Sequence, residues 1–295
     1  MPNFIDLKDL SKDQLLDLIS LSLKWKKESY PNFMNDKHVV LIFEKPSLRT
    51  RVSFEIGINQ LGGKSYILNE KEMQLGERET IEDTARVLER YADLIVIRCF
   101  GHNQLIKYAE TSSIPVINAL TDFSHPCQVI ADLITIKENL GNFEYQKVGW
   151  FGDCNNVLQS WIEASALLNI RFHIACPEGI NPDKETLAWA QDRNKNIIVT
   201  HDPLEAAHGA NCIITDTWNS MGETDPLPEE KFIPFQVNEK IIKLADKDVI
   251  FMHCLPAYRN KEVTSEVIES ANSVIFDEAE NRLHAQKAIM QFCFN

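Results

Sequence analysis

The strongest constraint on the fold of this chain is a repeated alternation between short apolar runs and longer amphipathic segments. The alternation occurs in two series, one on each side of Gly141 and Asn142. Short apolar runs that are bounded by turn residues and separated by helical patterns are typical of β–α units with parallel strands. We therefore predict an α/β fold with two domains, each a mainly parallel sheet flanked by helices.

The predicted domains span residues 1–140 and 141–279, and a C-terminal helix of about 280–295 is expected to pack back onto the first domain. The apolar runs predict strands at 39–43, 64–68, 93–98, 115–119, 148–151, 172–176, 197–200, 212–215, 249–252 and 273–276. The helical patterns predict helices at 52–61, 81–91, 103–111, 129–140, 157–168, 183–193 and 204–207. A capping box at Ser11 opens a first helix, and a last helix opens at Asp277, which places Arg282 in its first turn.

The segment Glu44–Arg51 directly follows the first strongly apolar run. An apolar run, a proline turn and an amphipathic segment together predict a strand, a loop and a helix. Unpaired N–H groups and the positive dipole end favour an anion at a helix N-terminus. Ser47 and Thr50 add hydroxyl groups, and Arg49 and Arg51 add planar forks that suit phosphate oxygens. We interpret this segment as a phosphate-binding loop.

Composition excludes several classes of protein. The formal net charge of −13 argues against a nucleic-acid or anionic-membrane surface. No apolar run reaches the roughly 18 residues needed to span a bilayer, and the N-terminus lacks the pattern of a signal peptide. The seven cysteines show no zinc-type spacing, which indicates free thiols in a reducing cytoplasm and no metal site. In such an acidic chain, a segment rich in arginine predicts an anionic ligand.

Chemically useful side chains recur where predicted strands end, which is where open parallel sheets bind ligands. Arg98 ends the third strand, where a binding role and a salt-bridge role carry similar weight. His125 and Gln128 follow the fourth strand, and this pairing suits a urea-like group, since His can polarise a carbonyl oxygen and Gln can bind an amide. Asp216 follows the strand at 212–215 and is placed to hold a cationic amine. Cys254 follows the strand at 249–252, where a buried packing thiol is the commoner outcome.

Two loops have alternative interpretations. The polar loop at 70–79 is either a solvated connector or a binding loop, and the residues alone favour the connector. The turn Gly152–Asn156 looks superficially like a dinucleotide-binding turn. It lacks the G-x-G-x-x-G glycines, however, so an oxidoreductase is disfavoured.

Five motifs in this order resemble those of the aspartate/ornithine carbamoyltransferase family, over essentially the whole chain. They are Ser47-Leu48-Arg49-Thr50-Arg51, His125-Pro126-Cys127-Gln128, Asp216 with Ser220-Met221-Gly222, His253-Cys254-Leu255-Pro256, and Glu280-Asn281-Arg282. The Ser-Met-Gly and His-Cys-Leu-Pro segments resemble the members that use ornithine rather than aspartate. Leu48 stands where many members carry Thr, so one hydroxyl is absent while the backbone N–H remains.

The resemblance implies transfer of the carbamoyl group of carbamoyl phosphate to the δ-amine of L-ornithine, in an active site in the cleft between the two domains. It implies carbamoyl phosphate contacts for Ser47, Leu48, Arg49, Thr50, Gln74, Arg98, His125, Gln128, Cys254, Leu255 and Arg282. It implies ornithine contacts for Asn156, Asp216, Ser220 and Met221, and catalytic roles for Arg98, His125, Asp216 and Cys254. No metal and no organic cofactor is expected. The Leu255–Pro256 peptide is expected to be cis.

The resemblance also implies a homotrimer, or a multiple of trimers, in which Gln74 reaches a neighbouring subunit's site. It points to arginine biosynthesis, although the site itself would serve both directions of arginine metabolism. Three alternatives remain: a carbamoyltransferase for another amine such as an N-acylornithine or putrescine, an oxidoreductase, and a catalytically inactive binding protein. The last is disfavoured because the motif residues are all kept.

Overall fold

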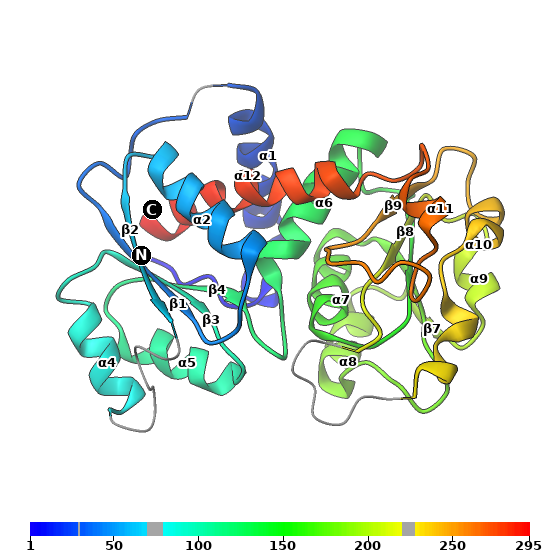
Figure 1. The fold of residues 1–295 in the computed structure, drawn as a ribbon, viewed down its shortest axis with the longest axis horizontal. Helices are drawn as coiled ribbons and strands as arrows, with labels where there is room; N and C mark the ends of the chain where they lie inside the picture. Colours follow the sequence, from blue (N-terminus) through cyan, green and yellow to red (C-terminus); the bar gives the residue numbers. More distant parts are fainter. Residues whose placement is uncertain (29, 70–78, 220–227) are drawn as a thin grey trace. The chain divides into compact units, whose positions relative to one another are not determined.

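The computed structural model describes residues 1–28, 30–69, 79–219 and 228–295, and its elements are labelled in Figure 1. The chain forms two compact units, Met1–Ala131 with Glu280–Asn295, and Asp132–Ala279. The division falls inside two helices, α6 (Pro126–Leu140) and α12 (Ile275–Phe294). It precedes the boundary expected at residue 140, because α6 already contacts the second unit's residues at Asp132, which accepts a hydrogen bond from Trp161 (2.8 Å).

The first unit contains a parallel sheet in the order β2-β1-β3-β4. Every neighbouring pair in this sheet is parallel. The central strands are buried along most of their length, as expected for parallel strands covered on both faces. The strands are β1 (His38–Phe43), β2 (Lys64–Asn69), β3 (Leu94–Arg98) and β4 (Val116–Leu120).

The helices of the first unit are α1 (Lys12–Lys27), α2 (Leu48–Gln60), α4 (Ile81–Leu88) and α5 (His102–Thr111), with a 3₁₀ turn at Leu7–Asp9. In Figure 1 the strands of this unit run between α4 and α5 on one side and α2 and α12 on the other. Gly57 of α2 lies against α12, where an added Cβ would come 3.4 Å from Lys287 and Met290. The lack of a side chain at Gly57 therefore lets the two helices approach closely.

The second unit contains a parallel sheet in the order β7-β6-β5-β8-β9. The strands are β5 (Lys147–Phe151), β6 (Arg171–Ala175), β7 (Ile197–Thr200), β8 (Cys212–Thr215) and β9 (Ile250–Met252). The helices are α7 (Asn156–Leu168), α8 (Lys184–Arg193), α9 (Pro203–Ala207), α10 (Glu239–Leu244) and α11 (Ser265–Ile268), with 3₁₀ turns at Glu229–Lys231 and Ile233–Phe235. In Figure 1, α7 and α8 lie on one side of this sheet and α9, α10 and α11 on the other.

Side-chain caps fix where several helices begin. Ser11 accepts from the backbone N–H of Gln14 (3.1 Å), whose side chain accepts from the N–H of Ser11 (2.8 Å), so the predicted capping box is confirmed. Thr80 caps α4 through the N–H of Asp83 (3.1 Å). Such caps satisfy backbone donors that the helix itself leaves unpaired. In the described part of the chain, none of the helices has the length and apolar character that a membrane crossing needs.

The predicted two-sheet α/β fold is confirmed, but the strand predicted at 273–276 is wrong. Ser273 makes only an isolated bridge with Phe251, and α12 begins at Ile275. A short apolar run fits the start of a buried helix as well as a strand, so periodicity could not separate the two. Because α12 begins before Asp277, Arg282 lies in its third turn and not in its first.

Candidate active site

A first group of candidate residues, in the first unit, lies at the carboxyl ends of β1 and β3, which are neighbours in the sheet. β2 lies on one side of β1, and β3, which follows β2 in the chain, lies on the other side, so the strand order reverses at β1. Open α/β sheets bind ligands at such a switch point. The loop after β1 ends at Ser47, whose hydroxyl oxygen accepts from the N–H of Thr50 (3.2 Å). The predicted strand–loop–helix unit is thus present, with Ser47 as the helix cap.

Two guanidinium groups converge on the buried hydroxyl of Thr50. Nη1 of Arg98, at the end of β3, donates to Thr50 Oγ1 (3.3 Å). Nη2 of Arg282, on α12, donates to the same oxygen (2.7 Å). Nη1 of Arg282 donates to Oε1 of the buried Gln128 (2.9 Å). Two guanidinium groups held at one oxygen present planar N–H donors that match phosphate and carboxylate oxygens, so this cluster is suited to an anionic ligand.

His125 is buried in the same unit, immediately before α6. Burial, followed by the positive charges of Arg282 and Arg98, lowers the pKa of His125 well below its usual value. The imidazole is therefore neutral at physiological pH and carries a single N–H. A neutral imidazole among guanidinium groups can donate to an uncharged carbonyl oxygen without adding a further positive charge.

The remaining residues of the predicted phosphate-binding loop differ in exposure. Leu48 is 75% exposed, while Arg49 is half-buried and its carbonyl accepts from the Ser53 hydroxyl (2.7 Å). Arg51 is exposed and pairs with Glu55 one turn on (3.4 Å). The structure therefore directs Arg51 toward a surface ion pair, an arrangement that the Arg-x-Arg spacing alone did not reveal.

A second group of candidate residues, in the second unit, lies at the switch point of that unit's sheet, where β5 and β8 are neighbours. Asp216 follows β8, and its Oδ2 accepts from Nδ2 of Asn155, which follows β5 (2.7 Å). Oδ1 of Asp216 accepts from the backbone N–H of Thr217 (2.8 Å). Asn155 also caps α7 through the N–H groups of Val157 and Leu158. The carboxylate is thus held in one orientation by donors from both strand ends.

Cys254 completes this arrangement, because its Sγ–H donates to Oδ1 of Asp216 (3.1 Å). Burial, together with the negative charges of Asp216 and Glu278, raises the pKa of Cys254 well above its usual value. Cys254 is therefore a thiol donor at neutral pH and not a thiolate.

The turn that carries Cys254 is supported by a buried hydrogen-bond network. Nδ1 of His253 accepts from the N–H of Leu255 (2.9 Å), so Nε2 carries the hydrogen that faces Glu262 (3.1 Å). Leu255 has a φ of 58°, in the left-handed region that bulky side chains rarely adopt. The Leu255–Pro256 peptide is cis, which confirms the expectation from the sequence.

Asp216, His253 and Cys254 offer three ligand-type atoms within 4.8 Å of one another, among the described residues. The Nδ1 lone pair of His253 is already engaged by Leu255, and the thiol of Cys254 favours its protonated form. To bind a metal, the imidazole would need a free lone pair and the cysteine would have to be a thiolate. The contacts are thus those of a hydrogen-bond network rather than of a metal centre.

The structure brings together two groups of the residues that the sequence singled out. Thr50, Arg98, Gln128 and Arg282 are joined by hydrogen bonds in the first unit, and Asp216 and Cys254 are joined in the second. Gln74, Ser220 and Met221 lie outside the described residues. Sequence reasoning missed Asn155, whose side chain holds Asp216. The position of Asn155 directly before a helical pattern, as for a capping residue, was the available signal.

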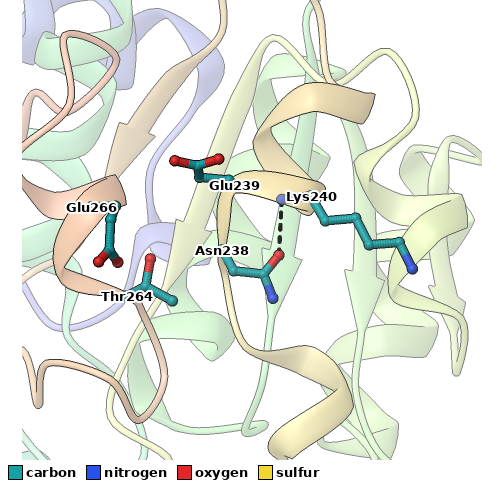
Figure 2. A pocket seen from close by; sticks show the side chains of 5 residues that line it. All are labelled: Asn238, Glu239, Lys240, Thr264 and Glu266. Carbon is teal, nitrogen blue, oxygen red and sulfur yellow. Dashed lines mark hydrogen bonds between the residues drawn. The ribbon is translucent and has the colours of Figure 1, made fainter.

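A surface pocket in the second unit is separate from these groups. Figure 2 shows it lined by Asn238, Glu239, Lys240, Thr264 and Glu266. Asn238 caps α10 there, accepting from the N–H of Lys240 (3.0 Å). Its mixed charges and the short helices around it show no preference for one type of ligand, and no residue predicted to be functional lines it.

Comparisons with known proteins match nearly the whole chain to one protein family. Residues 2–138 match the family described as "Aspartate/ornithine carbamoyltransferase, carbamoyl-P binding domain", and residues 144–293 match the "Asp/Orn binding domain" of the same family. The chain is 47% identical to an ornithine carbamoyltransferase of Rhodopseudomonas palustris, over 99% of this chain and 97% of that protein.

Two solved structures are similar throughout. That of the ornithine carbamoyltransferase from Pyrococcus furiosus has a TM-score of 0.94 at 42% identity and covers 98% of this chain and 96% of its own. That of the anabolic ornithine carbamoyltransferase from Campylobacter jejuni has a TM-score of 0.95 at 39% identity and covers 100% of this chain and 99% of its own.

Proposed function

The chain belongs to the aspartate/ornithine carbamoyltransferase family, and on that premise we propose that it carbamoylates L-ornithine. The δ-amine attacks the carbonyl carbon of carbamoyl phosphate, a C–N bond forms and the C–O bond to phosphate breaks. The products are L-citrulline and phosphate. The observation that carries the proposal is the convergence of Arg98 and Arg282 on Thr50, at the switch point of a parallel sheet.

We assign carbamoyl phosphate to the domain 1–140 together with the C-terminal helix. The phosphate is bound by Ser47, Leu48, Arg49 and Thr50, with Gln74 from a neighbouring subunit, and the carbamoyl end by Arg98, His125 and Gln128. Arg282 also contacts carbamoyl phosphate, and Cys254 and Leu255 line the reaction centre. The assignment is supported by the guanidinium groups of Arg98 and Arg282 that meet at Thr50 and by the family match over residues 2–138. Negative charge that develops on the carbonyl oxygen is stabilised by fixed donors, and removing one such donor typically slows a reaction by about 10²–10³.

We assign ornithine to the domain 141–279, with Asn156, Asp216, Ser220 and Met221 as its contacts. The carboxylate of Asp216, held by Asn155 and Thr217, is oriented to receive an ammonium group. The attacking amine must lose its proton, since only the neutral amine has a lone pair. Because the thiol of Cys254 keeps its hydrogen, we propose that Cys254 orients Asp216, and that the leaving phosphate is the final proton acceptor.

Citrulline formation by the purified protein tests this function directly. With carbamoyl phosphate present, L-ornithine should give a colorimetric ureido signal, whereas putrescine and N-acetylornithine should give little. A preference for either of those amines would assign the chain to another carbamoyltransferase. No carbamoylated product from any of the three amines would refute the proposal.

We further propose a homotrimer, or a multiple of trimers, in which Gln74 completes the site of a neighbouring subunit. The proposal is supported by an exposed apolar row on α2, where Leu48, Val52 and Ile56 are 75%, 41% and 43% exposed. Light scattering should give a multiple of three times the chain mass of 33.8 kDa. Mixing inactive Gln74→Ala and Arg49→Ala chains should restore part of the activity, because some mixed sites contain neither substitution.

We also propose that the chain acts in the cytoplasm and in arginine biosynthesis. All seven cysteines are free thiols in the structure, which suits a reducing compartment. Expression in a bacterium that lacks its own ornithine carbamoyltransferase should restore growth without arginine. Failure of an expressed and soluble chain to do so would contradict the biosynthetic assignment.

A further inference from the structure

The N-terminal segment carries a buried carboxylate to the carboxyl end of β4. Phe4 forms a parallel bridge with Ile117, through hydrogen bonds from Phe4 N to Val116 O (2.9 Å) and from Asn118 N to Phe4 O (2.8 Å). Asp6 follows two residues later and is 3% exposed. The pairing at the edge of the sheet thus fixes where this side chain lies.

Two side chains from later segments bind this carboxylate. The hydroxyl of Ser124 donates to Oδ1 of Asp6 (2.5 Å), and Nε2 of His102 lies 3.2 Å from Oδ2. Burial alone would raise the pKa of Asp6, but the hydrogen bonds from His102 and Ser124 outweigh it and lower the pKa below its usual value. Asp6 is therefore a buried anion with partners on both oxygens.

The turn Thr121–Ser124, between β4 and α6, receives these contacts. Thr121 N donates to Ser124 O (3.0 Å), and Ser124 N donates to Thr121 Oγ1 (3.2 Å). Nδ1 of His102 lies 2.9 Å from Thr121 Oγ1, so His102 bridges Asp6 and the turn. The Ser124 hydroxyl also accepts a hydrogen bond from Asn118 Nδ2 (2.9 Å) while it donates to Asp6.

The next residue after this turn is His125, and one turn of α6 later Gln128 accepts from Arg282. We propose that Asp6 is a positioning residue for carbamoyl transfer, because through Ser124 and His102 it fixes the turn that presents His125 and Gln128 to the carbamoyl group. The proposal rests on the proposed function, since it assigns Asp6 a role in binding one end of carbamoyl phosphate. Groups that hold a metal-ligating side chain commonly change affinity or activity about 10–100-fold when removed, and we expect an effect of that order for Asp6.

If Asp6 is a positioning residue, its substitution should weaken binding of the carbamoyl end of carbamoyl phosphate and not of the phosphate end. The phosphate is bound by the loop after β1, whereas Asp6 supports the segment after β4. Asp6→Asn keeps the shape of the side chain but replaces one carboxylate oxygen with an N–H₂ donor. Ser124→Ala removes the hydroxyl that links Asp6 to the turn. Both changes should therefore weaken binding of the carbamoyl group and leave the phosphate-binding loop intact.

Two probes separate the two ends of the ligand. Phosphonoacetamide carries a phosphonate and an amide, whereas inorganic phosphate carries only the anion. Calorimetry should show that the wild type binds phosphonoacetamide more tightly than phosphate. Asp6→Asn and Ser124→Ala should each reduce that preference about tenfold, with the phosphate affinity changed less than about twofold. In steady-state kinetics the KM for carbamoyl phosphate should rise, while the KM for ornithine should stay within about twofold.

Matched controls make the outcomes decisive. Asp13→Asn makes the same change at an exposed position of α1, and Ser22→Ala removes a buried hydroxyl that donates to Leu18 O in its own helix (2.7 Å). Both should keep the preference for the amide probe. A merely structural role of Asp6 would lower the melting temperature and leave that preference unchanged, which would overturn the proposal. Should Asp6→Asn fail to fold, Ser124→Ala alone decides. If the wild type binds neither probe and makes no citrulline, the proposed function fails instead.

Discussion

Cys254 and Asp216 form a direct hydrogen bond, with the thiol as donor and the carboxylate as acceptor (3.1 Å). The carboxylate also accepts from Asn155 and Thr217, so its two oxygens are held by three donors from separate segments. A carboxylate held by several donors is a defined acceptor for a charged amine. The pair thus combines an anion of fixed orientation with a thiol that does not compete as a base.

Asp216→Asn should raise the KM for ornithine far more than the KM for carbamoyl phosphate. The substitution removes a charged hydrogen bond, typically about 1.5–3 kcal/mol, which corresponds to roughly 10–100-fold in KM. Steady-state kinetics with each substrate varied in turn measures both constants. Asp183→Asn, which alters the cap of α8 in the same unit, should leave both constants near their wild-type values. Equal effects of Asp216→Asn on the two constants would remove Asp216 from the amine site.

Cys254 should act as a hydrogen-bond donor and not as a thiolate. Cys254→Ser keeps a donor toward Asp216 and should retain more kcat than Cys254→Ala, which keeps none. Because the pKa of Cys254 is raised well above its usual value of 9.0, the thiolate forms only at pH values above those at which an ordinary cysteine ionises. Iodoacetamide should therefore label Cys254 more slowly at pH 8 than it labels free cysteine, as followed by mass spectrometry. Rapid labelling, or loss of an ionisation from the pH profile of Cys254→Ser, would contradict a protonated thiol.

Arg49→Ala should abolish carbamoyl phosphate binding and leave the fold intact, because the fork of Arg49 is assigned to the phosphate. Arg51→Ala is the matched control, since Arg51 pairs with Glu55 on the exposed face of α2. Surface ion pairs of this kind contribute about 0–1 kcal/mol, so this variant should fold and bind almost normally. Calorimetry with phosphonoacetamide distinguishes the two variants. Wild-type affinity in Arg49→Ala would refute the placement of the phosphate.

The sheets were predictable because the strands are nearly continuous apolar runs, and β8 occupies the predicted residues 212–215. The prediction was wrong at 273–276, where a short apolar run begins a helix instead. Segments of four to six residues carry little periodicity: the short helices α10 and α11 were not predicted, although α9, of similar length, was.

The residues at strand ends were predictable for a different reason. Each parallel sheet places the carboxyl ends of its strands at one ligand-binding edge, so Arg98 at the end of β3 and Asp216 after β8 were identifiable from their positions. The contact of Asp6 with Ser124 was not, because it joins segments 118 residues apart. No local pattern records such a pairing, and it is the bridge between Phe4 and Ile117 that brings the two segments together.

Lys287 on α12 should make stability depend on pH in the alkaline range. It is fully buried, bonds Gln60 Oε1 (3.0 Å) and lies over the Tyr30 ring (3.8 Å), and burial lowers its pKa from 10.5 to about 8. Between these values Lys287 binds fewer protons in the folded chain than in the unfolded chain, so the destabilisation that it causes is absent above pH 10.5 and grows as the pH drops toward 8. Lys287→Met should remove roughly 2 kcal/mol of the difference in unfolding free energy between pH 8 and pH 10. Urea unfolding at both pH values measures this, with the exposed Lys12→Met as the control. The same pH dependence in Lys287→Met and wild type would mean that Lys287 keeps its ordinary pKa in the fold.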